Sequence, residues 1–172
     1  MLDEESFEEF SDPSSSVSPR WINGTGGKLD EKVMIRFVKE SFDKHGKIYV
    51  GTDSHRSGKN YIFATVVCLH GAENQQGGNY FFFRQKKRKA NFNSLHQRLL
   101  FETESSLNAA NMLRDYGISD IEVHIDCSPK TATHKSGKSA DVLFGYVIAS
   151  GFLCEIKPNS WAAHSIADRH AR

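Results

Sequence analysis

The sequence predicts one α/β domain whose mixed five-stranded sheet is flanked by helices and preceded by an N-terminal helix. Three apolar segments rich in β-branched and aromatic residues follow one another at 47–53, 61–69 and 79–85, with turn residues between them. Two further strand-like segments, at 121–126 and 152–156, alternate with stretches of helical periodicity. Antiparallel strands need only a turn and parallel strands need a crossover, so this order predicts a mixed sheet.

Helical patterns fill the segments before, between and after these strands. The first, at about 30–44, opens at a capping residue, Asp30, and repeats apolar side chains at helical spacing. A longer helix is predicted at about 94–115 and another at 139–150. A last helix is predicted to begin near Ser160 and to run nearly to the end of the chain. The predicted order is helix, three strands, helix, strand, helix, strand, helix.

The chain length of 172 residues suits one domain plus a tail. Residues 1–20 join an acidic start to a Ser- and Pro-rich stretch, so we expect a disordered tail before a domain at 21–172. The first 12 residues carry six acids and no base, and the rest hold 22 Lys and Arg against the remaining 15 of the 21 Asp and Glu. A modestly basic domain suits a polyanionic partner, and an ordinary solvated surface is the alternative.

Composition also indicates the cellular compartment in which the protein is expected. No apolar run approaches the roughly 18 residues that span a bilayer, so we expect no membrane partner. The acidic N-terminus has neither the basic nor the apolar region of a secretory signal. The three cysteines form no CxxC pair, which favours buried thiols in a reducing, cytoplasmic compartment.

Four acidic residues occupy positions that need an explanation. Asp53 ends the first predicted strand and Asp126 ends the fourth. Glu102 lies within the long predicted helix, and Asp168 lies within the last one. A charge at a buried strand end is costly unless it is paired or bound to a metal ion. Two strand-end aspartates together with an acid on the inward face of a helix therefore indicate a metal site.

The choice of Glu102 over Glu104 rests on helical spacing. Glu102 falls on or beside the apolar face of its helix, which includes Leu95, Leu99, Ala109 and Leu113. Glu104 lies about 160° away around the helix and is expected to face solvent. The alternative for Glu102 is an acid at the edge of that face whose carboxylate extends outward.

These elements and acids resemble those of the ribonuclease H-like superfamily, in which acids occupy the first strand, the first helix after the three-stranded unit, the fourth strand and the last helix. Four strings resemble, more narrowly, the YkuK-like family of predicted ribonuclease H-like nucleases. They are YVGTDSH (49–55), SLHQRLLFET (94–103), VHIDCS (123–128) and EIKPNSWAAHSIADRHAR (155–172). The resemblance covers about 21–172 and implies a ribonuclease H-like fold.

The resemblance also implies roles for the four acids. Asp53, Glu102 and Asp126 fall on the superfamily's metal-binding carboxylates. Asp168 falls on a fourth position that varies among members and where this family can carry an amide. The fourth ligand is thus the one that the resemblance supports least.

The chemistry of phosphodiester cleavage gives a separate argument for a metal-dependent nuclease. The reaction must stabilise extra charge at phosphorus and generate hydroxide at neutral pH, and two Mg²⁺ or Mn²⁺ ions about 4 Å apart do both. These hard cations take oxygen ligands. In this interpretation Asp53 would bridge both ions, Glu102 and Asp126 would hold one, and Asp168 would hold the other. We therefore predict a two-metal phosphodiesterase acting on RNA, DNA or a hybrid.

Basic residues and histidines supply candidate substrate contacts. The densest basic run lies between the third predicted strand and the long helix, where we expect a loop, and consists of Arg84, Lys86, Lys87, Arg88 and Lys89. Such a run can neutralise several phosphates, and a solvated loop is the alternative. His55 follows Asp53 closely enough to touch a phosphate, and His164 lies one helical turn before Asp168, where it can relay a proton. For both histidines, an ordinary surface or hydrogen-bonded role is the alternative.

Other functional classes fit less well. The GKS within HKSGKSAD (134–141) lacks the first glycine of a P-loop, because position 132 is Ala. Cys127, His124 and His134 lack the usual spacing of zinc ligands, and there is no GxSxG motif of a serine hydrolase. The main rival is a non-catalytic nucleic-acid or ribonucleoprotein-binding module on the same fold. A further alternative is a protein-interaction role, with the acidic tail as a peptide ligand for a protein partner.

Overall fold

The computed structural model describes residues 19–129 and 137–172. Its strands are β1 (Trp21–Asn23), β2 (Lys28–Leu29), β3 (Lys47–Ser57), β4 (Asn60–His70), β5 (Gly78–Arg88), β6 (Ile121–Ile125) and β7 (Leu153–Glu155). Its helices are α1 (Glu31–Asp43), α2 (Leu95–Asp115), α3 (Gly137–Ala149) and α4 (Asp168–Ala171), with a 3₁₀ turn at Lys89–Asn91 and a π-helical segment at Ala162–Ala167. Residues 1–18 of the expected tail lie outside the described residues, as does His134.

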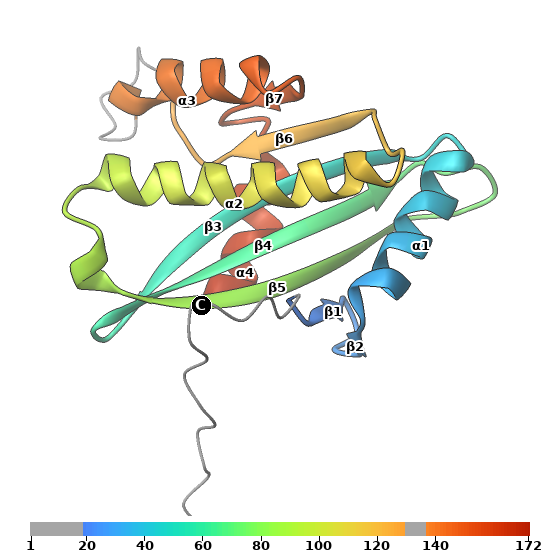
Figure 1. Cartoon of the computed structure of the whole chain (residues 1–172), viewed down its shortest axis with the longest axis horizontal. Coiled ribbons are helices and arrows are strands. Elements are labelled where there is room, and N and C mark those ends of the chain that lie inside the picture. The colour runs from blue at the N-terminus through green and yellow to red at the C-terminus, as the bar shows by residue number, and fades with distance from the viewer. Residues whose placement is uncertain (1–18, 130–136) are drawn as a thin grey trace, which may run out of the picture.

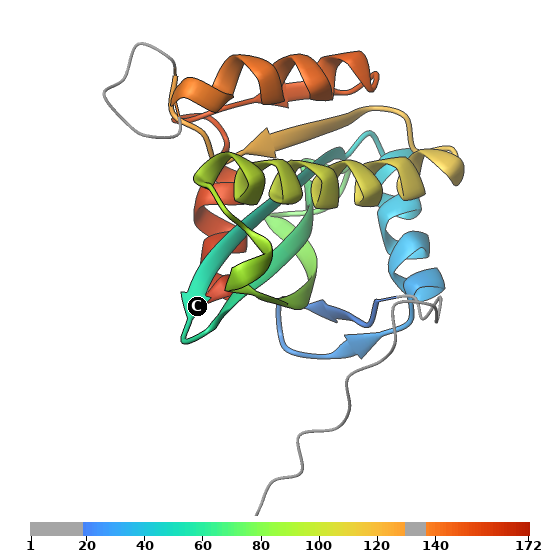
Figure 2. The same ribbon diagram turned by 60° about the vertical axis from the view of Figure 1, so that its left-hand side comes forward.

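One mixed sheet organises these elements. Its strand order is β2-β1-β5-β4-β3-β6-β7, in which β3, β4 and β5 form an antiparallel meander and β6 and β7 run parallel to β3. The main core lies between the sheet and helices α1, α2 and α3, and a smaller one lies under the C-terminal segment. Accordingly α1 and α2 cover one face and α4 lies against the other (Figure 1 and Figure 2). The predicted mixed α/β fold class is confirmed.

The meander is longer than the sequence pattern predicts. The linker expected at 55–60 is mostly strand, because β3 and β4 pair as far as Ser57 and Asn60 and turn at Gly58, whose φ is +56°. The prediction that the basic run forms a loop is wrong, because β5 pairs with β4 as far as Arg88, which lies opposite Asn60. An apolar pattern does not predict this part of the strand, because its side chains are cationic. Backbone pairing with β4 does not depend on side-chain polarity.

Two short strands add to the five that the sequence predicts. Ile22 and Asn23 of β1 pair with Phe82 and Phe81 of β5, and β2 pairs with β1. Trp21 is buried and meets the Phe83 ring edge-on, with ring centroids 4.8 Å apart. These strands are too short for a periodic sequence signal, and β1 is held by its pairing with the edge of β5.

The C-terminal segment also differs from the single α-helix predicted from Ser160. It is π-helical over Ala162–Ala167 before it becomes α4. The backbone of this segment lies directly on β3, and Ala162 N donates to Nδ1 of the buried His124 at 3.0 Å. His124 therefore satisfies one of the amide groups that the start of a helix leaves without a partner.

None of the helices in residues 19–129 and 137–172 combines the length and the apolar character that crossing a membrane requires.

Gly51→Ala should destabilise this fold. A Cβ added at Gly51 of β3 would lie 2.7 Å from Ala163 N, and overpacking of this kind costs about 1–3 kcal/mol. Gly145→Ala in α3 is the matched control, because its Cβ would meet no atom within 4 Å. Ala is preferred to Gly inside a helix by about 0.5–1 kcal/mol, so that variant should be more stable than wild type. Thermal unfolding should show shifts of opposite sign, and an unchanged melting temperature for Gly51→Ala would contradict the close contact.

Candidate active site

Asp53 and Asp126 come from adjacent parallel strands near the centre of the sheet. The register pairs Thr52 of β3 with Ile125 of β6, so the next residues, Asp53 and Asp126, lie at the same level. Ser106 Oγ of α2 donates to Thr52 Oγ1 at 2.8 Å, which places Thr52 on the α2 face. Successive side chains alternate between faces and residues in register share one. Asp53 therefore points to the α4 face, and the register directs Asp126 the same way.

Glu102 approaches the same strand end from α2. It is 2% exposed, whereas Glu104 faces solvent. Ser54 Oγ donates to Glu102 Oε1 at 2.5 Å, while Oε2 is buried without a hydrogen-bond partner. The carboxylate thus points inward, and the alternative in which it extends to solvent does not occur.

Three of the four predicted acids have a cationic partner. The closest approaches are Lys157 Nζ to Asp126 Oδ1 at 2.7 Å, Arg172 Nη2 to Asp168 Oδ2 at 3.0 Å, and Arg98 Nε to Glu102 Oε1 at 3.8 Å. Asp53 differs, because its Oδ1 accepts a hydrogen bond from the backbone N of Ser54 at 2.7 Å. The cations partly neutralise the outer acids and leave Asp53 as the least compensated of the group.

The sequence analysis missed these cations, although a signal existed for two of them. Arg98 and Arg172 each lie four residues from their acid, the spacing at which side chains meet on a helix. Lys157 is distant from Asp126 in sequence, and only the parallel pairing of β6 with β7 brings the two segments together. No local pattern could have found it.

Charge interactions link the acids pairwise. Burial raises the pKa of Asp53 to about 7, with the charge of Asp126 as the next cause and that of Asp168 as a smaller one. Burial also raises the pKa of Glu102 well above its usual range, and the charge of Asp53 adds to this effect. Each carboxylate therefore disfavours ionisation of its neighbours, which is the situation that a bound cation relieves.

The donor set fits a hard divalent cation. All four candidate ligands are carboxylates, the oxygen ligands that Mg²⁺ and Mn²⁺ prefer, and Glu102 Oε2 is a buried acceptor with no partner. As the side chains stand, no three His, Cys, Asp or Glu residues within 19–129 and 137–172 are grouped so that they could hold one ion. Asp126 and Asp168 instead contact Lys157 and Arg172.

The two predicted histidines lie at different places. His55 is exposed at the far end of β3 and lines a cavity of about 490 Å³ on the α4 face, together with Arg84, Lys86 and Arg172. His164 Nε2 lies 3.2 Å from Pro158 O, and its Nδ1 lies 2.8 Å from Ser165 Oγ. The relay assigned to His164 stays a prediction, and its ring is held within its own segment.

The basic run divides between the two faces of the sheet because it lies in β5. Arg84 stands in register with Ala64 of β4, which pairs with Asp53, so Arg84 shares the face of that carboxylate. Lys86 lies one pleat further along, on the same face. Lys87 faces α2, where its Nζ lies 5.8 Å from the centroid of the Phe101 ring. Only part of the run therefore shares the sheet face of Asp53.

A family model described as ribonuclease H-like matches residues 31–172, which include all four acids and the whole basic run. No curated protein matches the chain.

Proposed function

The chain belongs to the ribonuclease H-like family, and we propose that it is a metal-dependent nuclease that hydrolyses phosphodiester bonds in RNA, DNA or a hybrid. The observation that carries this proposal is the set of carboxylates formed by the buried Asp53 and Glu102 and the half-buried Asp126. Burial and, after it, the charges of the neighbouring acids raise the pKa of Asp53 and Glu102. The sequences YVGTDSH (49–55) and EIKPNSWAAHSIADRHAR (155–172) favour the YkuK-like branch of the family.

Asp53, Glu102, Asp126 and Asp168 are the residues that would hold two Mg²⁺ or Mn²⁺ ions. Such a pair supplies an activated water and stabilises the leaving oxygen. Asp53 would be the ligand that the two ions share, because it lies level with Asp126 in the register and its charge is coupled to those of Asp126, Asp168 and Glu102. Asp168 is the least essential of the four, since it is paired with Arg172 at the edge of the group.

Neighbouring side chains position the acids and receive the substrate. Ser54 Oγ fixes the orientation of Glu102 through its short hydrogen bond. Lys157 Nζ lies against Asp126, and its side chain is 39% exposed, so it can turn to a phosphate oxygen. Arg84, Lys86 and His55 line the adjacent cavity and supply further positive charge for the phosphate backbone.

The compartment is part of the same proposal. Cys68, Cys127 and Cys154 are all free and buried, which supports a reducing, cytoplasmic setting.

Lys86→Ala should weaken nucleic-acid binding at every sequence. Each lost phosphate contact should reduce the slope of log affinity against log salt by about 1. Lys87→Ala is the matched control within the same run, because that side chain faces α2, and it should change the slope less. Binding of labelled oligonucleotides over a salt series measures both variants. Equal losses in the two variants would contradict the division of the run between the faces.

Cleavage of labelled RNA, DNA and hybrid substrates in Mg²⁺ or Mn²⁺ tests the proposed activity. We expect products with metal and none after chelation. The second candidate is a non-catalytic nucleic-acid-binding module, which is favoured by the ion pairs that occupy Asp126 and Asp168. Salt-sensitive binding to the same substrates without cleavage under any metal condition would establish the module and reject the hydrolase.

A further inference from the structure

The N-terminal segment of the chain carries a charge that the folded domain complements. Residues 1–12 include six acids and no Lys or Arg, and no basic residue occurs before Arg20. The first described residues are Pro19 and Arg20, so the position of these two residues fixes where the segment leaves the domain.

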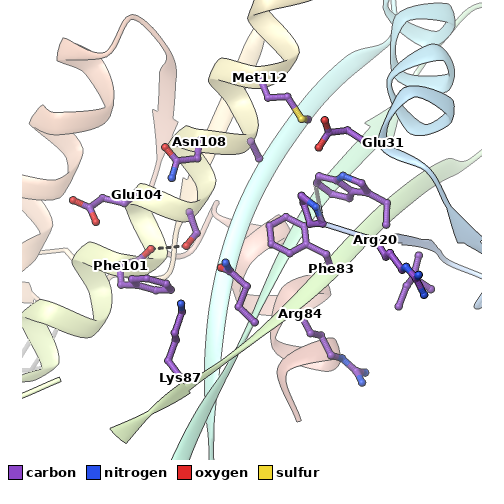
Figure 3. A pocket seen from close by; sticks show the side chains of 15 residues that line it. Arg20, Glu31, Phe83, Arg84, Lys87, Phe101, Glu104, Asn108 and Met112 are labelled. Carbon is purple, nitrogen blue, oxygen red and sulfur yellow. Dashed lines mark hydrogen bonds between the residues drawn. The ribbon is translucent and has the colours of Figure 1, made fainter. Parts of the chain in front are cut away.

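That exit lies beside the basic end of β5. Pro19 and Arg20 line a cavity of about 830 Å³ together with Arg84, Gln85 and Lys87. Figure 3 shows Arg20 and Arg84 on one side of this cavity and Lys87 below Phe101 on the other.

The direction of the chain at the exit points along β5. In the antiparallel register, Ile22 of β1 pairs with Phe82 and Asn23 pairs with Phe81. Moving from β1 toward the N-terminus therefore follows β5 toward Arg88. Within the described residues no strand pairs with the outer edge of β5 beyond Phe82.

The charged side chains that line the surface beside the turn between β3 and β4 are all positive. A cavity of about 790 Å³ is lined there by five cations and no acid, and we call these residues the basic surface: Arg56, Lys59, Lys86, Arg88 and Lys89. The exit cavity suits an acidic occupant less well, because Glu31 and Glu104 line it as well (Figure 3).

The chain between Asp12 and Pro19 is long enough for the acids of the segment to contact the basic surface. The seven residues from Pro19 back to Asp12 can extend about 23–25 Å. The strand distance from Gln85 to Lys89 is only about 13 Å. A tether of this length gives the acids an effective concentration in the millimolar range at the basic surface.

We propose that residues 1–12 dock on the basic surface of their own chain and compete there with nucleic acid. The docking follows from the charges and the exit point. The competition rests in addition on the proposed function, because it requires that the basic surface bind a phosphate backbone.

Zero-length carbodiimide cross-linking of the full chain tests the docking directly. Carboxylates of residues 1–12 should couple to Lys59, Lys86 or Lys89 within the monomer, as identified by mass spectrometry. The Lys47–Asp120 pair, whose Nζ and Oδ2 are 2.9 Å apart, is the internal positive control. Formation of that control link without links from the segment to the basic surface would overturn the docking. Links that form only between two chains would overturn it as well.

Nucleic-acid affinity tests the competition. A variant with all six segment acids neutralised should bind an oligonucleotide about tenfold more tightly than wild type at low salt, and the difference should shrink at high salt. Its substitutions are Asp3→Asn, Glu4→Gln, Glu5→Gln, Glu8→Gln, Glu9→Gln and Asp12→Asn. A control with the same change in net charge neutralises six exposed acids of the domain, namely Asp30, Glu40, Asp43, Glu73, Glu104 and Asp115.

The outcomes separate the two proposals. A gain in affinity confined to the segment variant supports competition, and equal gains in both variants overturn it. If none of the proteins binds nucleic acid, the proposed function and the competition both fail, while the cross-links still decide whether the segment docks.

Discussion

Asp53→Asn should abolish phosphodiester hydrolysis and leave the protein folded. The amide keeps the shape of the side chain, but it removes the charge that is coupled to Asp126, Asp168 and Glu102. Loss of a residue that merely supports a metal ligand lowers activity about 10–100-fold, so loss of the shared ligand should exceed about 100-fold. Cleavage of labelled substrates in Mg²⁺ and Mn²⁺, with circular dichroism of each protein, measures both effects.

Two further variants make this result specific. Asp120→Asn applies the same chemical change to an exposed carboxylate that pairs with Lys47, and it should retain wild-type activity. Asp168→Asn should reduce activity less than Asp53→Asn, because Asp168 lies at the edge of the acid group. If wild type and Asp53→Asn, purified in parallel, cleave equally well, the activity belongs to a contaminant or to another site.

The metal-free protein should gain stability from the Asp53 carboxyl as the pH falls from about 7 toward 4. The folded-state pKa of about 7 exceeds the ordinary value of 3.8, so the folded protein binds this proton more tightly than the unfolded chain does. The contribution is therefore complete below the unfolded pKa and is lost as the pH rises through the folded one. Its size is on the order of a few kcal/mol.

Comparison with Asp53→Asn isolates this contribution. The variant has no proton to lose at position 53, so it should be more stable than wild type at pH 8 and nearly equal to it at pH 4. Denaturant unfolding at the two pH values gives both differences in free energy. A constant difference across this range would contradict the raised pKa of Asp53.

Mg²⁺ or Mn²⁺ should replace the proton as the stabilising cation. Because metal binding must displace the Asp53 proton, affinity should rise with pH up to about 7 and level off above it. At about 100 times its Kd the ion should add roughly 2.7 kcal/mol to the stability of the folded state. Asp53→Asn should lose most of that gain. A melting temperature that millimolar metal does not change at pH 8 would reject metal binding by this group.

The sequence predicted those parts of the fold that depend on local periodicity. The five strands at β3 to β7 and the helices α1, α2 and α3 all carry an apolar repeat, and each is present. The inward direction of Glu102 followed from the same repeat on α2. The positions of Asp53 and Asp126 at neighbouring strand ends could also be anticipated, because the crossover between their strands predicts parallel pairing.

The features that the sequence did not predict depend on partners that lie far along the chain. The basic run reads as a loop until β4 is known to pair with β5 as far as Arg88. β1 and β2 are too short for a pattern and form on an existing edge. The contact between Lys157 and Asp126 exists only after β7 has joined β6. The π-helical geometry at 162–167 has no counterpart in the predicted repeat.

The parallel register of β3 and β6 limits where insertions and deletions can be accepted. Backbone hydrogen bonds, rather than side chains, hold Asp53 level with Asp126, since Thr52 pairs with Ile125. Inserting or deleting one residue within β6 would turn the aspartate that follows it to the other face of the sheet. The turn at 116–120 lies outside the paired segment and can absorb such a change. Insertions and deletions among homologues of this chain should therefore occur in that turn rather than in β3 or β6.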